Sequence, residues 1–253
     1  MSVYDVLDAI IEENHVAEGR MDGRSYVHLY GRNPSVSSGT VPEDVWNVGG
    51  VYAGFSTEVE TLSIVSTSTA DDIVGTGTRT VRVYGLDANY DAQEEDVDLD
   101  GTTPVTTVNT YLRCWKVLGI ASGTGGTNAG DITINHSTTT ANVFGKILAG
   151  KNTTHQCIYT VPAGFTAYVV SYEAAMLDNG SNRSIMTGYS KDNNGNELEI
   201  RPFIITTTYN SSFHIHGGLP IPEKTDLAMR VSSVSGSNAD ITGSFEIRQV
   251  RNF

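Results

Sequence analysis

Two groups of residues have the types and spacing that metal binding requires. The first, Asp96-Val97-Asp98-Leu99-Asp100-Gly101, begins like a calcium loop, in which carboxylates at alternate positions surround a hard cation. The twelfth position of such a loop should be a bidentate Glu, and it is Thr107 here. Val97 and Leu99 alternate with the acids as they would in a strand. We therefore favour an acidic strand edge, whose charge discourages aggregation, over a calcium site.

The histidines offer the second possible metal site. His214 and His216 are two residues apart, so both imidazoles would point to one face of a strand, as a zinc or nickel site can use. His155 and Cys157 have the same spacing, and the four side chains could form one centre if their strands paired. No pattern in the sequence pairs them, so ordinary surface histidines are favoured. We predict no bound metal and no cofactor.

The sequence predicts no enzyme and no catalytic residue. It contains neither a G-x-S-x-G nucleophile turn nor an H-E-x-x-H motif. The segment Gly75-Thr76-Gly77-Thr78-Arg79 resembles a phosphate loop but leads into a strand, whereas phosphate cradles need a helix amino end. The pairs Glu58/Glu60 and Glu197/Glu199 could flank a glycosidic bond, yet such pairs arise wherever an exposed strand face is acidic.

The elements that would carry these residues are β-strands. The 253 residues include 29 Thr, which is β-branched and favours strands, and 26 Gly, which permits tight turns. From Val59 onward, roughly ten short alternating runs follow one another without a helical pattern. We predict an all-β fold, an antiparallel β-sandwich and most simply a jelly roll. Asn193-Asn194-Gly195 is expected to join two strands through a type I′ turn.

The first 55 residues differ from the rest of the chain. Apolar residues at helical spacing predict an amphipathic helix over residues 2–17, with a stripe formed by Val3, Val6, Leu7, Ile10 and Ile11. This helix is too short to be stable alone, so its stripe should dock on the sheet, a neighbouring subunit or a larger assembly. An extended arm containing Trp46 and Tyr52 follows. We predict two parts, the helix and arm (1–55) and the sandwich domain (56–253), with these seven side chains as assembly contacts.

Tyrosine and tryptophan outside the strands suggest a further role. Tyr90 and Trp46 are candidate ligand contacts, because such rings stack on sugars or partner proteins. Packing of the arm on the sandwich is the alternative for Trp46 and Tyr90, as for Tyr26, Tyr30 and Tyr52.

Charge and targeting signals limit the possible partners. The sequence has 16 Lys and Arg against 29 Asp and Glu, a net charge of −13, which argues against binding to nucleic acid. The start of the chain lacks the basic flank and apolar core of a signal peptide, and no segment approaches the roughly 20 apolar residues of a membrane span. We expect no membrane partner, and we expect Cys114 and Cys157 to be buried thiols.

A series of short motifs follows one another along the chain. It comprises Glu43-Asp44-Val45-Trp46-Asn47-Val48-Gly49-Gly50, Ser66-Thr67-Ser68-Thr69-Ala70-Asp71-Asp72, Gly75-Thr76-Gly77-Thr78-Arg79, Gly85-Leu86-Asp87-Ala88-Asn89-Tyr90, Gly101-Thr102-Thr103-Pro104-Val105, Asn128-Ala129-Gly130-Asp131-Ile132, Tyr159-Thr160-Val161-Pro162-Ala163-Gly164 and Glu223-Lys224-Thr225-Asp226. The ordered series resembles a family of virion structural proteins from tailed bacteriophages of aquatic bacteria, from about residue 18 onward. The resemblance implies a particle component, present in the virion after assembly in the host cytoplasm, and supplies no catalytic residues.

These observations predict a homo-oligomeric, most simply trimeric, structural protein on the outside of a phage particle. It would decorate the head or contribute to a fibre or neck, in contact with further copies of itself and with other virion proteins such as the major capsid protein. The alternative is a carbohydrate-binding module that acts in host adsorption, since jelly rolls host sugar sites in loops lined by Tyr and Trp. A depolymerase-type enzyme is the third possibility.

Overall fold

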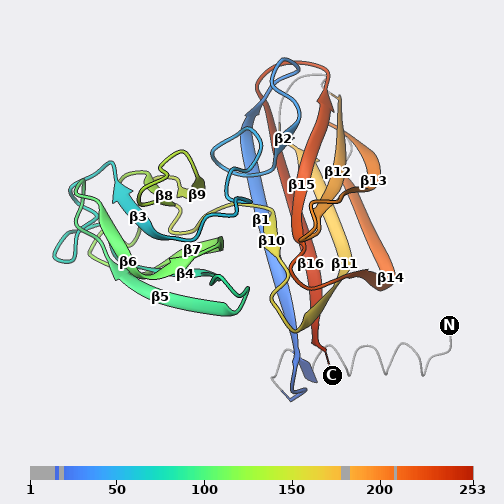
Figure 1. Ribbon diagram of the computed structural model, residues 1–253. Helices are drawn as coiled ribbons and strands as arrows, with labels where there is room; N and C mark the ends of the chain where they lie inside the picture. Colours follow the sequence, from blue (N-terminus) through green and yellow to red (C-terminus); the bar gives the residue numbers. More distant parts are fainter. Residues whose placement is uncertain (1–14, 17–19, 178–182, 208–209, 253) are drawn as a thin grey trace.

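The chain folds into antiparallel β-sheets, as the sequence predicted. The computed structural model describes residues 15–16, 20–177, 183–207 and 210–252. Within these residues the regular structure is almost entirely β-strand (Figure 1). The predicted amino-terminal helix, residues 2–17, lies outside the described residues except for His15 and Val16. In the part of the chain that is described, no helix is both long and apolar enough to span a bilayer.

The first and last parts of the chain form one jelly roll. Its eight main strands are β1 (Arg24–Val36), β10 (Ile158–Thr160), β11 (Phe165–Met176), β12 (Arg183–Lys191), β13 (Glu197–Thr206), β14 (Ser211–Ile221), β15 (Asp226–Val234) and β16 (Ala239–Arg251). One sheet has the order β1-β16-β11-β14 and the other β10-β15-β12-β13, with the short β2 (Glu43–Asp44) added beside β15. Taking β1 and then β10 to β16 as the successive strands, this order is the two-sheet winding of a jelly roll.

Side-chain alternation places the core of the jelly roll between these two sheets. In β16, Ile241, Phe245 and Ile247 are buried, whereas the intervening Ser244 and Glu246 are more exposed. This is the period of two that the sequence of the last strand indicated. The buried side chains of the other strands, among them Val169, Met186 and Met229, complete one apolar cluster.

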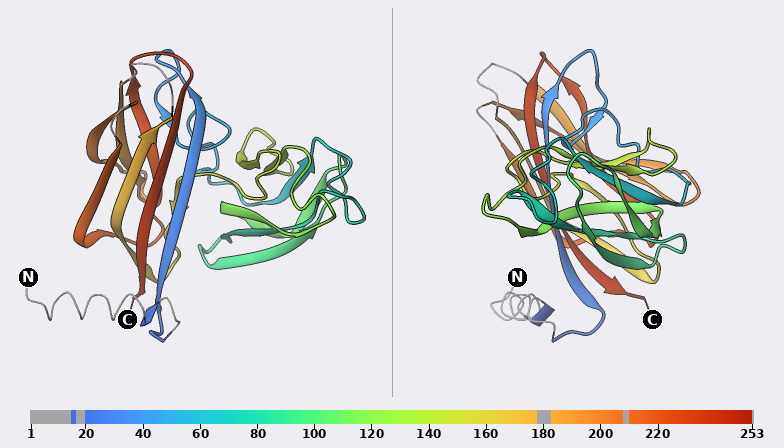
Figure 2. Two further views of the ribbon diagram at one scale, coloured as in Figure 1. Left: turned by 180° about the vertical axis from the view of Figure 1, so that it is seen from behind. Right: turned by 90° about the vertical axis from the view of Figure 1, so that its left-hand side faces the viewer.

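The middle of the chain forms a second, smaller sandwich. Its strands are β3 (Glu60–Ser66), β4 (Thr78–Leu86), β5 (Ala92–Asp98), β6 (Val105–Tyr111), β7 (Arg113–Ser122), β8 (Ile132–His136) and β9 (Val143–Ile147). They make the sheets β6-β3-β8-β9 and β5-β4-β7, with a core that includes Leu62, Val83 and Ile134. We call it the inserted sandwich, because it lies between β2 and β10 in sequence and to one side of the jelly roll in space (Figures 1 and 2).

The two segments that connect the sandwiches run side by side. The Cys157 amide donates to the Val45 carbonyl at 2.9 Å, and Trp46 and Gln156 form a β-bridge. Both segments cross closely over β1 at Gly31, where a Cβ atom would overlap the Val45 carbonyl and the Cys157 amide. Gly31 is therefore required for this crossing, since any side chain would push the connecting segments away.

Residues 24–44 belong to the jelly roll and do not form an extended arm. β1 pairs with β16 from Arg24 to Val36, and Glu43 and Asp44 pair with β15. These residues fall within the helix and arm (1–55) that the sequence predicted. Their partners lie about 200 residues away in sequence, so no local pattern could indicate the pairing.

The predicted hairpin between β12 and β13 is present, but the prediction of a type I′ turn is wrong. Lys191 pairs with Glu197, which leaves five residues in the loop. Gly195 has a positive φ of 84°, whereas Asn194 does not, and a type I′ turn needs both central residues in that region. The Asp192 carboxylate instead accepts hydrogen bonds from the amides of Asn194 and Asn196, which stabilises the wider loop.

Candidate functional site

A buried ion pair joins the two sandwiches. Arg113 begins β7 of the inserted sandwich, and its guanidinium donates two hydrogen bonds, of 2.8 and 2.9 Å, to the carboxylate of Asp226 at the start of β15. Both side chains are 7% exposed. Arg113 also donates to the Ser56 carbonyl, and Thr160 donates to Asp226, so the pair is extensively hydrogen-bonded. Separating the two sandwiches here would leave each buried charge without its partner. The ion pair therefore holds the two sandwiches in this arrangement.

Trp46 and Tyr52 form the aromatic part of the same junction. They are 2% and 4% exposed, and their rings pack edge to face at 4.9 Å. The Tyr52 hydroxyl donates to carbonyl oxygens of Cys114 and Phe144, and burial raises the pKa of this hydroxyl well above its usual value. These rings therefore lie inside the protein, which does not agree with their prediction as partner or ligand contacts. An aromatic residue in an irregular segment looks the same in the sequence whether its ring is buried in the protein or contacts a partner.

The remaining predicted assembly contacts cannot be placed. Val3, Val6, Leu7, Ile10 and Ile11 lie outside the described residues, so their docking stays a prediction.

Tyr90 lies in a cleft between the sandwiches, which Arg113 and Asp226 of the ion pair also line. The cleft has a volume of about 280 Å³ and is bounded by the β12–β13 loop of the jelly roll and by the segments around Phe55 and Tyr90. The Tyr90 hydroxyl donates to Asn193 at 3.1 Å, and the Ala163 amide donates to the Tyr90 carbonyl at 2.9 Å. These contacts fix the ring between the two parts of the protein.

Two residues of this cleft have an unusual backbone conformation. Tyr90 has φ 67° and Lys224 has φ 59°, the left-handed region that large side chains rarely adopt. The Lys224 ammonium lies 5.7 Å from the centre of the Tyr90 ring, and the Arg113 guanidinium lies 5.9 Å from it. Burial raises the pKa of the Tyr90 hydroxyl. The cleft thus combines an aromatic ring, a cation and a neighbouring amide, which can stack on and hydrogen-bond a sugar.

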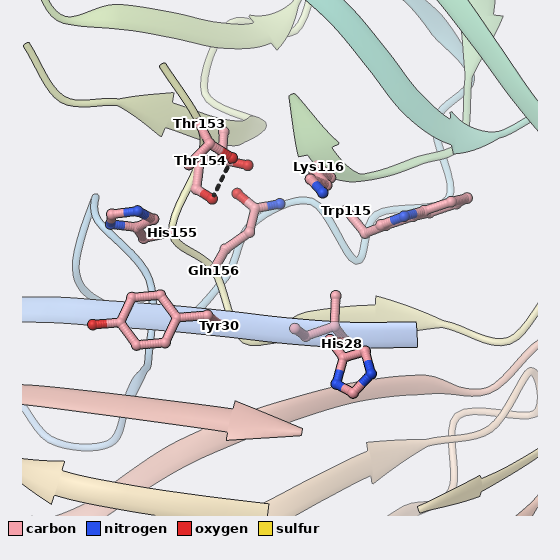
Figure 3. A pocket seen from close by; sticks show the side chains of 9 residues that line it. His28, Tyr30, Trp115, Lys116, Thr153, Thr154, His155 and Gln156 are labelled. Carbon is pink, nitrogen blue, oxygen red and sulfur yellow. Dashed lines mark hydrogen bonds between the residues drawn. The ribbon is translucent and has the colours of Figure 1, made fainter. Parts of the chain in front are cut away.

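A second hollow lies where β1 meets the inserted sandwich. It has a volume of about 190 Å³ and is lined by His28, Tyr30, His155, Gln156 and neighbouring side chains (Figure 3). The rings of Tyr30 and His155 meet edge to face at 5.2 Å. Burial, together with the positive charges of Lys151 and Arg32, lowers the pKa of His155, so this ring is neutral near pH 7.

The composite histidine–cysteine metal centre does not form among the described side chains. His155 lies beside β1, whereas His214 is on β14, at the opposite edge of the same sheet. Cys157 is fully buried, and burial raises the pKa of its thiol well above the usual value, which opposes the thiolate form that metals need. His155 and His214 belong to separate surfaces, because no pairing joins β14 to the segment that contains His155.

The first part of the acidic run, Asp96 to Asp98, is the end of β5, as favoured from its alternation, and Asp100 follows the strand in isolated β-bridges with Asp72 and Thr103. Asp96 is in β5 and accepts two hydrogen bonds from Arg82, at 2.6 and 2.8 Å. Asp98 accepts a hydrogen bond from Thr80. β5 is an edge strand, so these carboxylates line the exposed side of the inserted sandwich and do not converge as a calcium loop requires.

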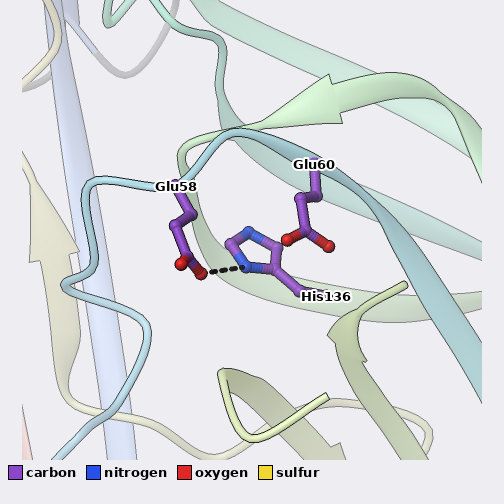
Figure 4. A group of neighbouring side chains, drawn as sticks. All are labelled: Glu58, Glu60 and His136. Carbon is purple, nitrogen blue, oxygen red and sulfur yellow. Dashed lines mark ion pairs between the residues drawn. The ribbon is translucent and has the colours of Figure 1, made fainter. Parts of the chain in front are cut away.

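Glu58, Glu60 and His136 form a cluster that the sequence analysis did not bring together. One ligand atom of each lies within 4.8 Å of the others, and the imidazole lies between the two carboxylates (Figure 4). The pairing of Leu62 in β3 with His136 in β8 creates this proximity. The two glutamates were recognisable as a pair in the sequence. His136 is more than 70 residues away, and only the register between β3 and β8 shows that it lies beside them.

Comparison with known proteins gives little further information. No protein-family model and no curated protein sequence matches the chain. Solved structures that match include infectious bursal disease virus Gx strain, at 9% identity over 91% of this chain and 76% of that chain, with a TM-score of 0.20. The VP2 subviral particle of infectious bursal disease virus matches at 6% identity over 91% and 77% of the two chains, with a TM-score of 0.17. These scores are too low to establish a shared fold.

Proposed function

We propose that this protein is a non-enzymatic structural component of a tailed-phage virion. In this proposal it is a homo-oligomer, a trimer, on the exterior of the particle, where it decorates the head or belongs to a fibre or neck. Its partners are further copies of itself and other virion proteins such as the major capsid protein. The series of motifs from Glu43 to Asp226 supplies the phage context.

The observation that carries the proposal is the complete eight-stranded jelly roll. Viral capsid domains use this architecture, and the support is at the level of the fold. The net charge of −13 agrees with an exterior position, because an interior protein would face packaged nucleic acid across strong repulsion.

An exposed sheet edge supports self-association. β13 is the last strand of its sheet, and Leu198 and Ile204 on it are 59% and 43% exposed. A free strand edge that carries apolar side chains is a template for pairing with another chain. Val74 and Val108 of the inserted sandwich, 83% and 88% exposed, are further apolar positions available to a neighbour.

The test is cryo-electron microscopy of intact particles together with the mass of the purified protein in solution. We expect stoichiometric density for both sandwiches on the particle surface, and a trimer by light scattering. Absence of the protein from purified particles would refute the proposal, whereas a particle-bound monomer would refute only the trimer. Deletion of residues 1–20 should abolish incorporation while leaving the sandwiches folded.

The Tyr90 cleft favours a second candidate, a carbohydrate-binding module for host adsorption. Domain junctions are common ligand sites, and the Lys224 ammonium beside the ring suits a sugar that carries a carboxylate. Tyr90→Ala should then abolish selective binding on a glycan array. The control is Tyr84→Ala, because Tyr84 lies on β4, beside Lys116 and away from the cleft. This variant should leave the selective binding unchanged. An array without any selective signal would discard this candidate.

A further inference from the structure

A fully buried imidazole faces two carboxylates on the inserted sandwich. His136 has no exposed side-chain surface, and its Nδ1 atom is 3.9 Å from Oε2 of Glu58, which is 49% exposed. Glu60 approaches from the other side of the ring (Figure 4). We propose that Glu58, Glu60 and His136, the His136 cluster, bind a divalent transition metal ion, and that zinc fits the donor set best.

The hydrogen bonds of His136 make Nδ1 the available donor atom for a metal. Nε2 lies 3.4 Å from the Tyr111 carbonyl, which can only accept, so the ring proton belongs on Nε2. The Asn142 amide nitrogen, which can only donate, lies 3.3 Å from Nδ1. Nδ1 therefore carries the ring's lone pair, and a metal ion that binds there would replace its contact with the Asn142 amide. A backbone carbonyl that holds the opposite ring nitrogen is also the usual outer contact of a metal-binding histidine.

The two carboxylates have complementary properties as ligands. Glu60 is held by the Thr139 hydroxyl at 2.6 Å and by the amides of Thr138 and Thr139, at 2.8 and 3.1 Å. These contacts, the Thr139 hydroxyl first, lower the pKa of Glu60 to about 2, so it is ionised and fixed. Glu58 is exposed and accepts a single hydrogen bond, from Asn142 at 2.8 Å. One ligand is thus preorganised, and the other can adjust to an ion.

The chemistry of the donors selects the metal. Calcium and magnesium prefer oxygen donors alone, whereas an imidazole with carboxylates suits zinc. Tetrahedral zinc with ligands at 2.0–2.2 Å needs donor atoms about 3.3 Å apart. The three donor atoms lie within 4.8 Å of one another and Glu58 is 3.9 Å from Nδ1, so both carboxylates must close in on the ion. Glu58 is exposed and can rotate towards it. Three protein ligands leave the fourth position to water on the solvent side, where Glu58 lies.

The test is calorimetric titration of the untagged, chelator-treated full-length protein with zinc chloride. We expect one zinc per chain, and a loss of at least about tenfold in affinity for Glu58→Gln, which keeps the size of the side chain. Glu94→Gln is the matched control, because Glu94 is an exposed carboxylate of the same sandwich that lies outside the cluster and pairs with Arg82. It should bind zinc as the wild type does.

The location of the ion provides the second measurement. Anomalous diffraction at the zinc edge should give a peak between Glu58, Glu60 and His136. His136→Gln removes the nitrogen ligand, but it also alters packing against the Phe144 ring at 4.6 Å, so the surface variant Glu58→Gln decides the outcome. No zinc binding, unchanged binding in Glu58→Gln, tighter binding of calcium chloride than zinc, or a peak elsewhere would each overturn the proposal.

Discussion

The jelly roll and the inserted sandwich are held together in different ways. In the jelly roll, β1, β11 and β16 are 12 to 13 residues long and pair side by side over most of their lengths. In the inserted sandwich, strands β8 and β9 have only five residues each. Its loops are correspondingly longer, and polar side chains bind the loop backbone where strand ladders are lacking. The comparison shows that a β-sandwich can be held either by long strand ladders or by side-chain hydrogen bonds to its loops.

Asp71 shows how a polar side chain stabilises the loops of the inserted sandwich. Its fully buried carboxylate accepts hydrogen bonds from the amides of Thr78, Ala129 and Gly130, at 2.8–2.9 Å, and from the Ser66 hydroxyl at 2.6 Å. Gly77 packs so closely that a Cβ atom there would overlap this carboxylate. The stretch that resembled a phosphate loop in sequence therefore donates a hydrogen bond to the buried side chain of Asp71, and Gly77 makes room for that side chain.

The largest expected effect tests whether the buried ion pair stabilises the junction between the two regions. Arg113→Ala removes one partner of the buried ion pair and leaves Asp226 without its charge partner, which should cost about 3–5 kcal/mol of unfolding free energy. Urea denaturation followed by fluorescence measures the change. Arg82→Ala is the control, since it breaks an equally bidentate but exposed pair with Asp96 and should cost much less. Equal losses would show that the junction does not depend on the buried pair.

A smaller effect should be confined to one region. Asp71→Ala leaves three backbone amides and a hydroxyl without their acceptor, at a cost of about 3 kcal/mol. Hydrogen exchange by mass spectrometry should show faster exchange around residues 66–80 and 128–130, with the jelly roll strands unchanged. Asp72→Ala, which removes one hydrogen bond to the Val74 amide, serves as the control. Equal acceleration in β11 and β16 would mean that the two regions form one cooperative unit.

The smallest effect concerns acid stability of the inserted sandwich. The folded pKa of Glu60, about 2, lies below the ordinary value of 4.5, so its hydrogen bonds stabilise the folded state above about pH 4.5. This contribution is lost as the pH falls from 4.5 towards 2. Glu60→Gln should therefore weaken the dependence of stability on pH in that window, as measured by thermal unfolding at several pH values. If the unfolding temperature of Glu60→Gln depends on pH as that of the wild type does, the low pKa of Glu60 is contradicted.

The sequence predicted more of the fold than of the candidate sites. The alternation in residues 241–250 and the turn residues Asn193-Asn194-Gly195 were sufficient for β16 and for a hairpin, because both signals are local. The sequence could not show that two sandwiches are present, since the strands of both have the same period of two. Tyr90 was identified as a ligand candidate from its residue type, but the cleft around it depends on Asn193 and Lys224 from the other sandwich.

The sequence by itself determined an acidic, antiparallel all-β protein, because residue preference and a period of two act between neighbours along the chain. Only the tertiary structure decided that residues 60–147 form an inserted sandwich, that Trp46 and Tyr52 are internal, and that His136 meets Glu58 and Glu60. Each of these depends on pairing between distant segments, as in the hydrogen bonds of Arg32 with Asp240, 208 residues apart. Such pairing is selected by the burial of whole sheet faces, which no single segment encodes.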